Sequence, residues 1–351
     1  MELLKKLPSP VGLSHDEIME ILYREEYGYP PPPPTSVSAV VVKEETYYFE
    51  RKASLIHLDL KITGDFGTFT LPVRYAKLKQ AEEPVPAFLH INFMRDIPNK
   101  YQPTEEILDG GFNLFSVYYN DISIDDPHFA PGNFKDGLAG LIYPDGKRPA
   151  GAGGKLTLWA WTMSALLTYV RTLPEIDPDC ISVIGHSRLG KTALLAGAMD
   201  PRFFCAISNN SGASGAAIMR EKTGETLRGI YEHFPFWFCE KYAEYFDKED
   251  TLPFDQHFLI AANATHRVYV GAGSYDKTAC PEHEYLGAYA AGEYFESVGK
   301  TGLLGATEEY PAPWSFFHDG HIGFHLRDGG HFLGRYDWNM YMAYIKKHRG
   351  K

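Results

Sequence analysis

The sequence has no apolar run long enough to cross a membrane and no dense set of cysteines. A membrane-spanning helix needs about 20 predominantly apolar residues, so no membrane association is expected. The 351 residues carry 34 Lys and Arg against 45 Asp and Glu, a formal net charge of −11. This acidic balance argues against nucleic acid and against an anionic membrane surface as partners.

Cysteines are few and widely spaced: Cys180, Cys205, Cys239 and Cys280. Their spacing fits no metal site, and we expect buried free thiols. The first residues also lack the long apolar segment of a secretory signal. This favours a cytoplasmic location, although a secreted protein whose leader is missing from the sequence would look the same. No feature of the sequence predicts the oligomeric state.

The stretch 181–192 is the point around which the chain is organised. Ile181–Gly185 is a short apolar run rich in β-branched residues, which predicts a buried strand. Gly185 and Gly190 bracket a tight turn, and a helix is expected from Thr192 onward. A strand, a sharp turn and a helix present chemistry at the carboxyl end of a sheet.

Two motifs overlap in this stretch. From Gly185 it matches G-x-x-x-x-G-K-T, a phosphate-binding loop in which Lys191 would reach the terminal phosphate. Around Ser187 it is close to G-x-S-x-G, a nucleophile elbow, except that Leu189 stands at the second glycine position. A third interpretation is a plain strand-to-helix connection with a small residue at the bend.

The rest of the chain favours the hydrolase motif. A phosphate-binding enzyme needs an acidic residue at the end of a second apolar strand, but the apolar strands 88–92, 207–210 and 268–273 end in asparagine or glycine. A serine hydrolase of this class needs an acid and then a histidine downstream. Asp276 follows the strand at 267–273, and His331 follows a Gly-Gly pair before the last expected helix.

These residue types suit ester hydrolysis. A serine hydroxyl such as that of Ser187 is a weak nucleophile and needs a base within hydrogen-bond reach. His331 can take the proton, while Asp276 holds the imidazole in the required tautomer. Arg188 offers its backbone N–H and its guanidinium to the developing oxyanion. This mechanism proceeds through an acyl-enzyme and needs neither a metal nor a cofactor.

Alternatives remain open at each position. The other histidines near the predicted base are His318, His321 and His325, and Asp328 is the nearest carboxylate that could replace Asp276. Asp276 itself could simply cap a loop.

The expected fold is a single α/β domain over residues 1–351 with an N-terminal arm over about 1–36. The arm consists of a helix at 14–27, capped by Ser14, and a stiff extended spacer at Pro30–Pro34. Alternating residues at 37–74 predict antiparallel strands.

Beyond residue 86, strands and helices alternate, which predicts a mostly parallel sheet with helices on both faces. The segment 120–156 shows no periodicity, and either a functional loop or a surface crossover would explain it.

Longer motifs resemble the bacterial branch of the glucuronoyl esterases. They are Gly-His-Ser-Arg-Leu-Gly-Lys-Thr-Ala-Leu at 185–194, Ile-Ser-Asn-Asn-Ser-Gly-Ala-Ser-Gly-Ala-Ala at 207–217, Gly-Glu-Thr at 224–226, Phe-Pro-Phe-Trp-Phe-Cys at 234–239, Leu-Pro-Phe-Asp-Gln-His-Phe-Leu-Ile at 252–260 and Arg-Asp-Gly-Gly-His at 327–331. The resemblance implies an α/β-hydrolase fold, a three-layer sandwich with antiparallel N-terminal strands. It also implies a serine esterase that cleaves esters between glucuronate of xylan and lignin alcohols.

The resemblance assigns further roles. It implies Ser187 as nucleophile, His331 as base and the Arg188 side chain as oxyanion stabiliser. It also implies that Lys191 and Glu225 bind sugar hydroxyls; without it, Lys191 would be taken for a helix-surface lysine.

Two positions depart from the family pattern. Asn210 stands where some members carry a catalytic glutamate, which leaves Asp276 as the acid. Thr278 stands where many bacterial members have a tryptophan that packs on the sugar. Trp237, which we predict to bind substrate, and Trp314 are candidate substitutes.

The predicted function is a carboxylesterase acting on a small or oligosaccharide ester, with a glucuronoyl ester as first choice. A related enzyme that removes acetyl or another acyl group from a carbohydrate is the second. A non-catalytic carbohydrate-binding relative is the alternative outside enzymes.

Overall fold

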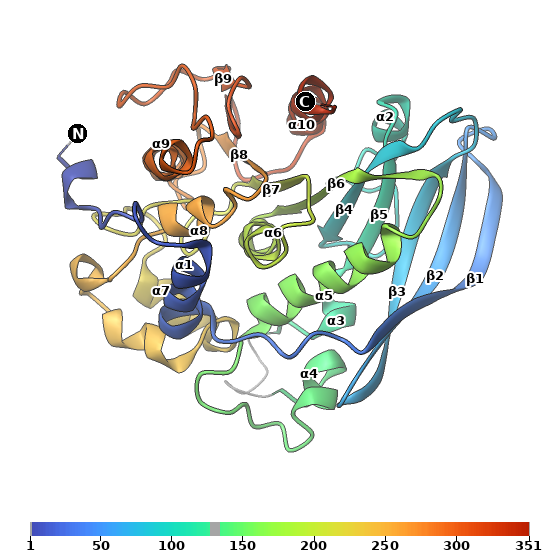
Figure 1. Cartoon of the computed structure of the whole chain (residues 1–351), viewed down its shortest axis with the longest axis horizontal. Coiled ribbons are helices and arrows are strands. Elements are labelled where there is room, and N and C mark those ends of the chain that lie inside the picture. The colour runs from blue at the N-terminus through green and yellow to red at the C-terminus, as the bar shows by residue number, and fades with distance from the viewer. Residues whose placement is uncertain (1, 127–133, 351) are drawn as a thin grey trace.

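The computed structural model describes residues 2–126 and 134–350 and contains a ten-stranded mixed sheet (Figure 1). The strand order is β1-β2-β3-β5-β4-β6-β7-β8-β10-β9. The strands are β1 (Ser36–Tyr48), β2 (Ala53–Gly64), β3 (Gly67–Leu78), β4 (Val85–Asn92), β5 (Asn113–Tyr118), β6 (Ile176–His186), β7 (Cys205–Asn209), β8 (Arg267–Gly273), β9 (Phe316–Phe317) and β10 (Ile322–Arg327). Within the sheet, the six neighbouring strands β5-β4-β6-β7-β8-β10 are parallel to one another. The remaining strands, β1, β2, β3 and β9, pair antiparallel with their neighbours. The predicted mixed sheet is confirmed.

Helices lie on both faces of the sheet. They are α1 (His15–Leu22), α2 (Thr104–Asp109), α3 (Tyr119–Ile122), α4 (Gly137–Ile142), α5 (Lys155–Val170), α6 (Arg188–Met199), α7 (Leu227–His233), α8 (His257–Ala261), α9 (Pro281–Ser297) and α10 (Arg335–His348). Short 3-10 helices are η1 (Leu4–Lys6), η3 (Pro235–Trp237), η4 (Glu240–Tyr245) and η5 (Glu249–Thr251), and η2 (Tyr23–Tyr27) is a π-helix. Among the described residues no helix is long and apolar enough to span a bilayer.

Two hydrophobic clusters show how the layers form. Leu89 of β4 and Val183 of β6 belong to the cluster that includes α5, α6 and α9. Phe88, which precedes Leu89, and Ile184, which follows Val183, belong to the cluster that includes α2 and α10. Successive strand residues point to opposite faces, and both faces are covered by helices. The central strands are therefore apolar throughout, as expected for buried parallel strands.

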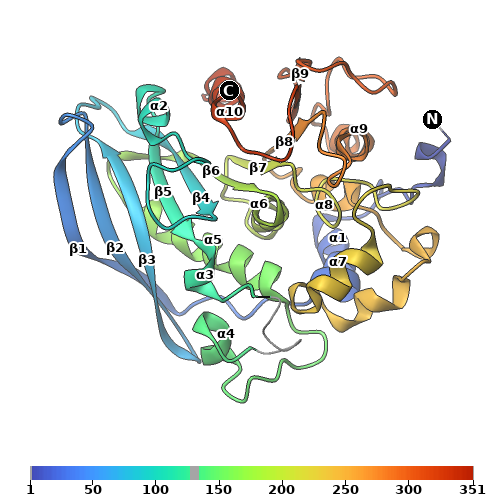
Figure 2. The ribbon, with the colours of Figure 1, turned by 180° about the vertical axis from the view of Figure 1, so that it is seen from behind.

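The N-terminal arm packs along the outside of the helical layer. Ser14 and Glu17 form a capping box at the start of α1, and the helix continues as η2 to Tyr27, in agreement with the predicted helix. The extended segment that follows is held by Trp161 of α5, whose indole N–H donates to Pro32 O at 3.2 Å. Figures 1 and 2 show this segment running past α5 to reach β1, with β1–β3 at the opposite end of the molecule from α9.

The segment 120–156, in which the sequence shows no periodicity, contains helices. It includes most of α3, all of α4 and the start of α5. Residues 127–133 of this segment lie outside the described residues. The four cysteines are buried and free, as predicted.

Candidate active site

Ser187 occupies a one-residue turn between β6 and α6. Its φ of 58° and ψ of −128° are sparsely populated by residues with a side chain. The turn is so tight that a Cβ at Gly185 would lie 2.0 Å from the carbonyl oxygen of Leu189. Leu189 itself is fully buried in the core, so the glycines that the close approach requires are Gly185 and Gly190. The departure at Leu189 therefore leaves the elbow intact.

A chain of hydrogen bonds joins the three predicted triad residues. His331 lies in the loop between β10 and α10, and its Nε2 is 2.8 Å from Ser187 Oγ. Its Nδ1 is 2.5 Å from Asp276 Oδ2, just past β8. Because β6, β8 and β10 are parallel, their carboxyl ends meet at one edge of the sheet. That edge brings the three residues together.

Asp276 is buried and receives two further hydrogen bonds. Asn210 Nδ2 donates to Oδ2 at 2.8 Å, and the Ala279 N–H donates to Oδ1 at 3.1 Å. Burial alone would raise the pKa of Asp276, but the hydrogen bonds from His331, Ala279 and Asn210 outweigh it and hold the pKa below 3.8. Asn210, at the position where some relatives carry an acid, thus supports the carboxylate of Asp276.

The rival histidines are engaged elsewhere. His325 is buried against Asp337 at 2.8 Å, and His318 lies 2.6 Å from the Tyr269 hydroxyl. His321 accepts from the Thr301 N–H at 3.1 Å. Asp328 accepts from the Ser274 hydroxyl. Of the candidate bases in the described part of the chain, His331 alone is hydrogen-bonded to Ser187.

His186 is a site residue that the sequence did not single out. It is buried, its Nδ1 lies 2.7 Å from Asn209 Oδ1, and its ring centroid is 4.5 Å from that of His331. Burial, with a contribution from His331, lowers the pKa of His186 to about 3. A neutral imidazole therefore lies beside the base, and no second positive charge opposes protonation of His331. Its position next to Ser187 was the signal that could have identified it.

The side chain of Arg188 is held by Asp125, which in turn is bound by Trp237. Its Nη1 lies 2.5 Å from Asp125 Oδ2, and the Trp237 indole N–H donates to Asp125 Oδ1 at 2.7 Å. Trp237 is only 2% exposed. The ring of Trp237 is buried and its N–H is taken by Asp125, so the predicted contact between Trp237 and substrate stays a prediction. Trp314, which is 54% exposed, is the candidate that keeps an accessible ring.

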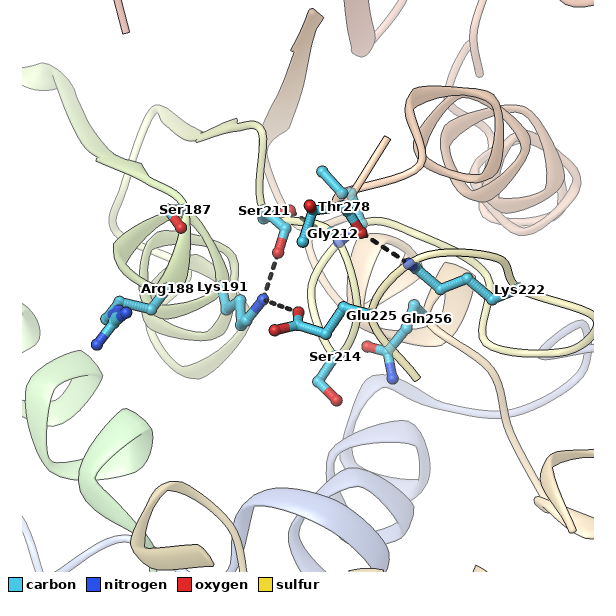
Figure 3. Close-up of polar contacts among 12 residues, drawn as sticks. Ser187, Arg188, Lys191, Ser211, Gly212, Ser214, Lys222, Glu225, Gln256 and Thr278 are labelled. Atoms are coloured by element: carbon cyan, nitrogen blue, oxygen red, sulfur yellow. Dashed lines mark hydrogen bonds and ion pairs between the residues drawn. The ribbon is translucent and has the colours of Figure 1, made fainter. Parts of the chain in front are cut away.

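A polar cluster lies beside Ser187 and Arg188 (Figure 3). Lys191 is 3% exposed; its Nζ donates to Ser211 O and lies 3.8 Å from Glu225 Oε2. Burial lowers the pKa of Lys191. Lys222 Nζ donates to the carbonyl oxygen of Thr278 at 3.1 Å. Lys191 is thus no helix-surface lysine, and its side chain points toward Glu225 in the figure.

The geometry does not fit a phosphate-binding loop. Such a loop directs successive backbone N–H groups at the ligand, whereas the Ser187 N–H donates to Asn209 O at 2.8 Å. The Gly190 and Lys191 N–H groups both donate to Ser187 O. The amides of this turn therefore hold the elbow in shape.

Glu284 of α9 is a second residue that the sequence did not identify. It is fully buried, and its Oε1 accepts from the Gly212 N–H at 2.9 Å and from the Ser211 hydroxyl at 3.4 Å. Its Oε2 has no hydrogen-bond partner among the described residues. Burial raises the pKa of Glu284 to about 8. No motif marks this residue, so only the fold shows that it supports the loop that carries Ser211.

Comparisons with known proteins indicate the family of the chain. Residues 132–299 match the family model described as glucuronyl esterase, fungi. The carbohydrate esterase MZ0003 from an unknown prokaryotic organism is 38% identical over 247 residues, which cover 70% of this chain and 55% of that protein. A 4-O-methyl-glucuronoyl methylesterase of Podospora anserina is 33% identical over 131 residues, 34% of this chain and 27% of that protein. The chain thus spans about half or less of these curated relatives.

Solved structures match over nearly the whole chain. A promiscuous CE15 esterase from a marine bacterial metagenome is 29% identical with a TM-score of 0.85, and the match covers 97% of this chain and 96% of that one. A glucuronoyl esterase from Solibacter usitatus is 30% identical with a TM-score of 0.85, and covers 97% and 93%. The fold is therefore that of an α/β-hydrolase. Because this chain is 30% identical to that glucuronoyl esterase and the match covers 93% of it, the chain belongs to the glucuronoyl esterase family.

Proposed function

We propose that the protein is a serine carboxylesterase that cleaves a uronoyl ester of a carbohydrate. The observation that carries the proposal is the position of His331, 2.8 Å from the hydroxyl of Ser187 and 2.5 Å from the carboxylate of Asp276. A base within this distance can take the hydroxyl proton, and the depressed pKa of Asp276 keeps a negative charge beside the imidazolium that forms.

Each bond change has a group to support it. Ser187 Oγ attacks the ester carbonyl carbon while its proton passes to His331 Nε2. The tetrahedral intermediate then expels the alcohol, which takes that proton and leaves an acyl-enzyme. Water activated by His331 attacks the acyl carbon, and the second collapse releases the uronate and restores the Ser187 hydroxyl.

Arg188 is the proposed oxyanion donor. As the first residue of α6, it has a backbone N–H without an intrahelical acceptor, at the positive end of the helix dipole. In the loop after β4, the Met94 N–H donates to Asn92 Oδ1 at 3.1 Å, so it is not free for an oxyanion. The guanidinium of Arg188 is therefore the better candidate for the second donor.

Family membership and the polar cluster support a sugar acid as the acyl group. Lys191 and Glu225 lie together beside the nucleophile, and a pair of opposite charges can donate to and accept from sugar hydroxyls. Thr278 is exposed where many relatives carry an aromatic platform, which favours a second candidate, an esterase with a wider range of acyl groups.

The test compares benzyl glucuronate and 4-nitrophenyl acetate as substrates. Wild type, Ser187→Ala and His331→Ala are assayed, with Ser297→Ala on the far end of α9 as a matched control. We expect wild type and the control to cleave the glucuronate, and both site variants to lose at least about 1,000-fold in kcat. Cleavage of acetate alone would move the function to another acyl group. A wild type that cleaves neither ester and resists a fluorophosphonate would support a non-catalytic carbohydrate-binding protein.

A further inference from the structure

The side chain of Arg188 is held by two residues that no motif connects with it. Asp125 comes from the segment between α3 and α4, and Trp237 comes from η3, more than a hundred positions further along the chain. The two are joined by the hydrogen bond from Trp237 Nε1 to Asp125 Oδ1, and Asp125 Oδ2 binds Arg188 Nη1. The three residues thus form one chain of contacts that ends beside the nucleophile.

Aromatic rings hold the guanidinium from a second direction. Arg188 Cζ lies 4.7 Å from the ring centroid of Trp237 and 4.8 Å from that of Phe234. These two rings stack on each other with centroids 3.9 Å apart and an interplanar angle of 4°. Cation–π contacts of this kind stabilise a guanidinium over a ring face. Trp237 therefore touches Arg188 directly and also through Asp125.

One N–H donor of the Arg188 guanidinium makes no hydrogen bond among the described residues. This donor is Nε, which is buried. An unsatisfied buried N–H costs free energy, and such a group in a native structure calls for an explanation. Next to a nucleophilic serine, an oxygen of the reacting substrate is the acceptor that would satisfy it.

We infer that Asp125 and Trp237 are positioning residues that fix the Arg188 guanidinium in advance for the oxyanion. The inference rests on the proposed function. An arginine side chain has large rotamer entropy, and a donor stabilises a transition state best when it needs no reorganisation. Asp125 fixes the guanidinium at one nitrogen, and Trp237 fixes Asp125. The remaining N–H groups are then available to the substrate.

A purely structural ion pair is the alternative. Asp125 has a fully buried side chain, and Arg188 is a quarter exposed at 26%. Such a pair could serve only to anchor the segment after α3. In that case its loss would lower the free energy of unfolding without changing the reactivity of Ser187 in the folded molecules. A double-mutant cycle separates the two roles because positioning can act only through Arg188.

The experiment measures the second-order rate constant for labelling of Ser187 by a fluorophosphonate, and kcat and KM for benzyl glucuronate. The variants are Asp125→Asn and Trp237→Phe, each in the wild-type and the Arg188→Met background. Asp200→Asn is the matched control: it removes the charge of a buried carboxylate that pairs with the exposed Arg202 at the far end of α6. All variants are compared at equal folded concentration, set by thermal unfolding.

Asp125→Asn should lower the labelling rate and kcat by about 10- to 100-fold, the range for a misplaced transition-state donor. KM should change less than about threefold. Trp237→Phe keeps an aromatic ring but removes the indole N–H that binds Asp125, so a loss of about 3- to 10-fold is expected. In the Arg188→Met background neither change should lower the rate further, and Asp200→Asn should behave as wild type.

Equal losses in both backgrounds would overturn the inference, as would normal rates in Asp125→Asn. A wild type that is labelled but does not cleave the glucuronate would overturn the proposed substrate, while the labelling rates would still decide the role of Asp125. A wild type that is not labelled would overturn both.

Discussion

Glu284 gives the sharpest test of the buried electrostatics of this site. Burial raises the pKa of its carboxyl to about 8, and nearby Asp276 adds to the effect of burial, whereas Lys191 and Lys222 oppose it. The perturbation is Glu284→Gln, which keeps the shape of the protonated acid and an oxygen to accept from the Gly212 N–H. The charge, and with it the dependence on pH, is removed.

The size of the effect follows from proton linkage. In the unfolded chain the carboxyl ionises near its ordinary value of 4.5, and in the folded protein near about 8. Between these values the folded state binds one proton more than the unfolded state, so stability falls by about 1.4 kcal/mol for each pH unit as the pH rises. The contribution of Glu284 to the free energy of unfolding is fully present below pH 4.5 and is lost by about pH 8. The loss amounts to roughly 5 kcal/mol in total.

The assay is urea unfolding at a series of pH values from 5 to about 8.5, with wild type and variant side by side. The difference in the free energy of unfolding, variant minus wild type, should rise by about 1.4 kcal/mol per pH unit and level off above pH 8. Glu26→Gln is the matched control: burial raises the pKa of Glu26 to about 7, so its difference should level off about one unit earlier. A difference that does not change with pH would refute the reasoning for Glu284.

Three further predictions concern the site itself. Asp276→Asn should lower kcat by about 1,000- to 10,000-fold, because an amide N–H facing His331 Nδ1 favours the wrong tautomer; a loss below tenfold in steady-state assays would contradict this. Asn210→Asp would place a second carboxylate 2.8 Å from Asp276 Oδ2, so the pKa of the pair should rise and the acidic limb of the kcat/KM profile should move to higher pH; an unmoved limb would show that the two groups do not interact. Glu225→Gln and Lys191→Met should raise KM for benzyl glucuronate at least about tenfold and leave 4-nitrophenyl acetate hydrolysis within about threefold, because acetate has no hydroxyls to bind; equal losses on both esters would argue for a structural role.

The elbow and the triad could be predicted because their signals are local or follow the order of the chain. Gly185, Ser187 and Gly190 lie within six positions, and the strand-to-helix pattern around them survives in the fold. Asp276 and His331 each follow a strand that reads as buried from its own residues. Since parallel strands end at one edge, their order in the chain was enough to bring them together.

The supports of these residues could not be predicted in the same way. Trp237 was expected to face a sugar, and its burial depends on the stack with Phe234 and on Asp125 from a distant segment. Glu284 lies on a helix whose pattern gives no reason to expect a buried acid. Whether a polar side chain faces solvent or a neighbour is decided by packing between elements far apart in sequence. That information is not contained in local periodicity.

The position of His331 in the last strand-to-helix loop has a consequence for how the protein is made. Synthesis proceeds from the N-terminus, so Ser187 leaves the ribosome well before Asp276 and His331. The hydroxyl meets its base only after β10 has added to β8 and α10 has closed over the sheet. An unfinished or partly unfolded chain therefore carries a serine that is no better a nucleophile than any other. A reactive Ser187 therefore indicates that the C-terminal strand and helix have packed onto the rest of the fold.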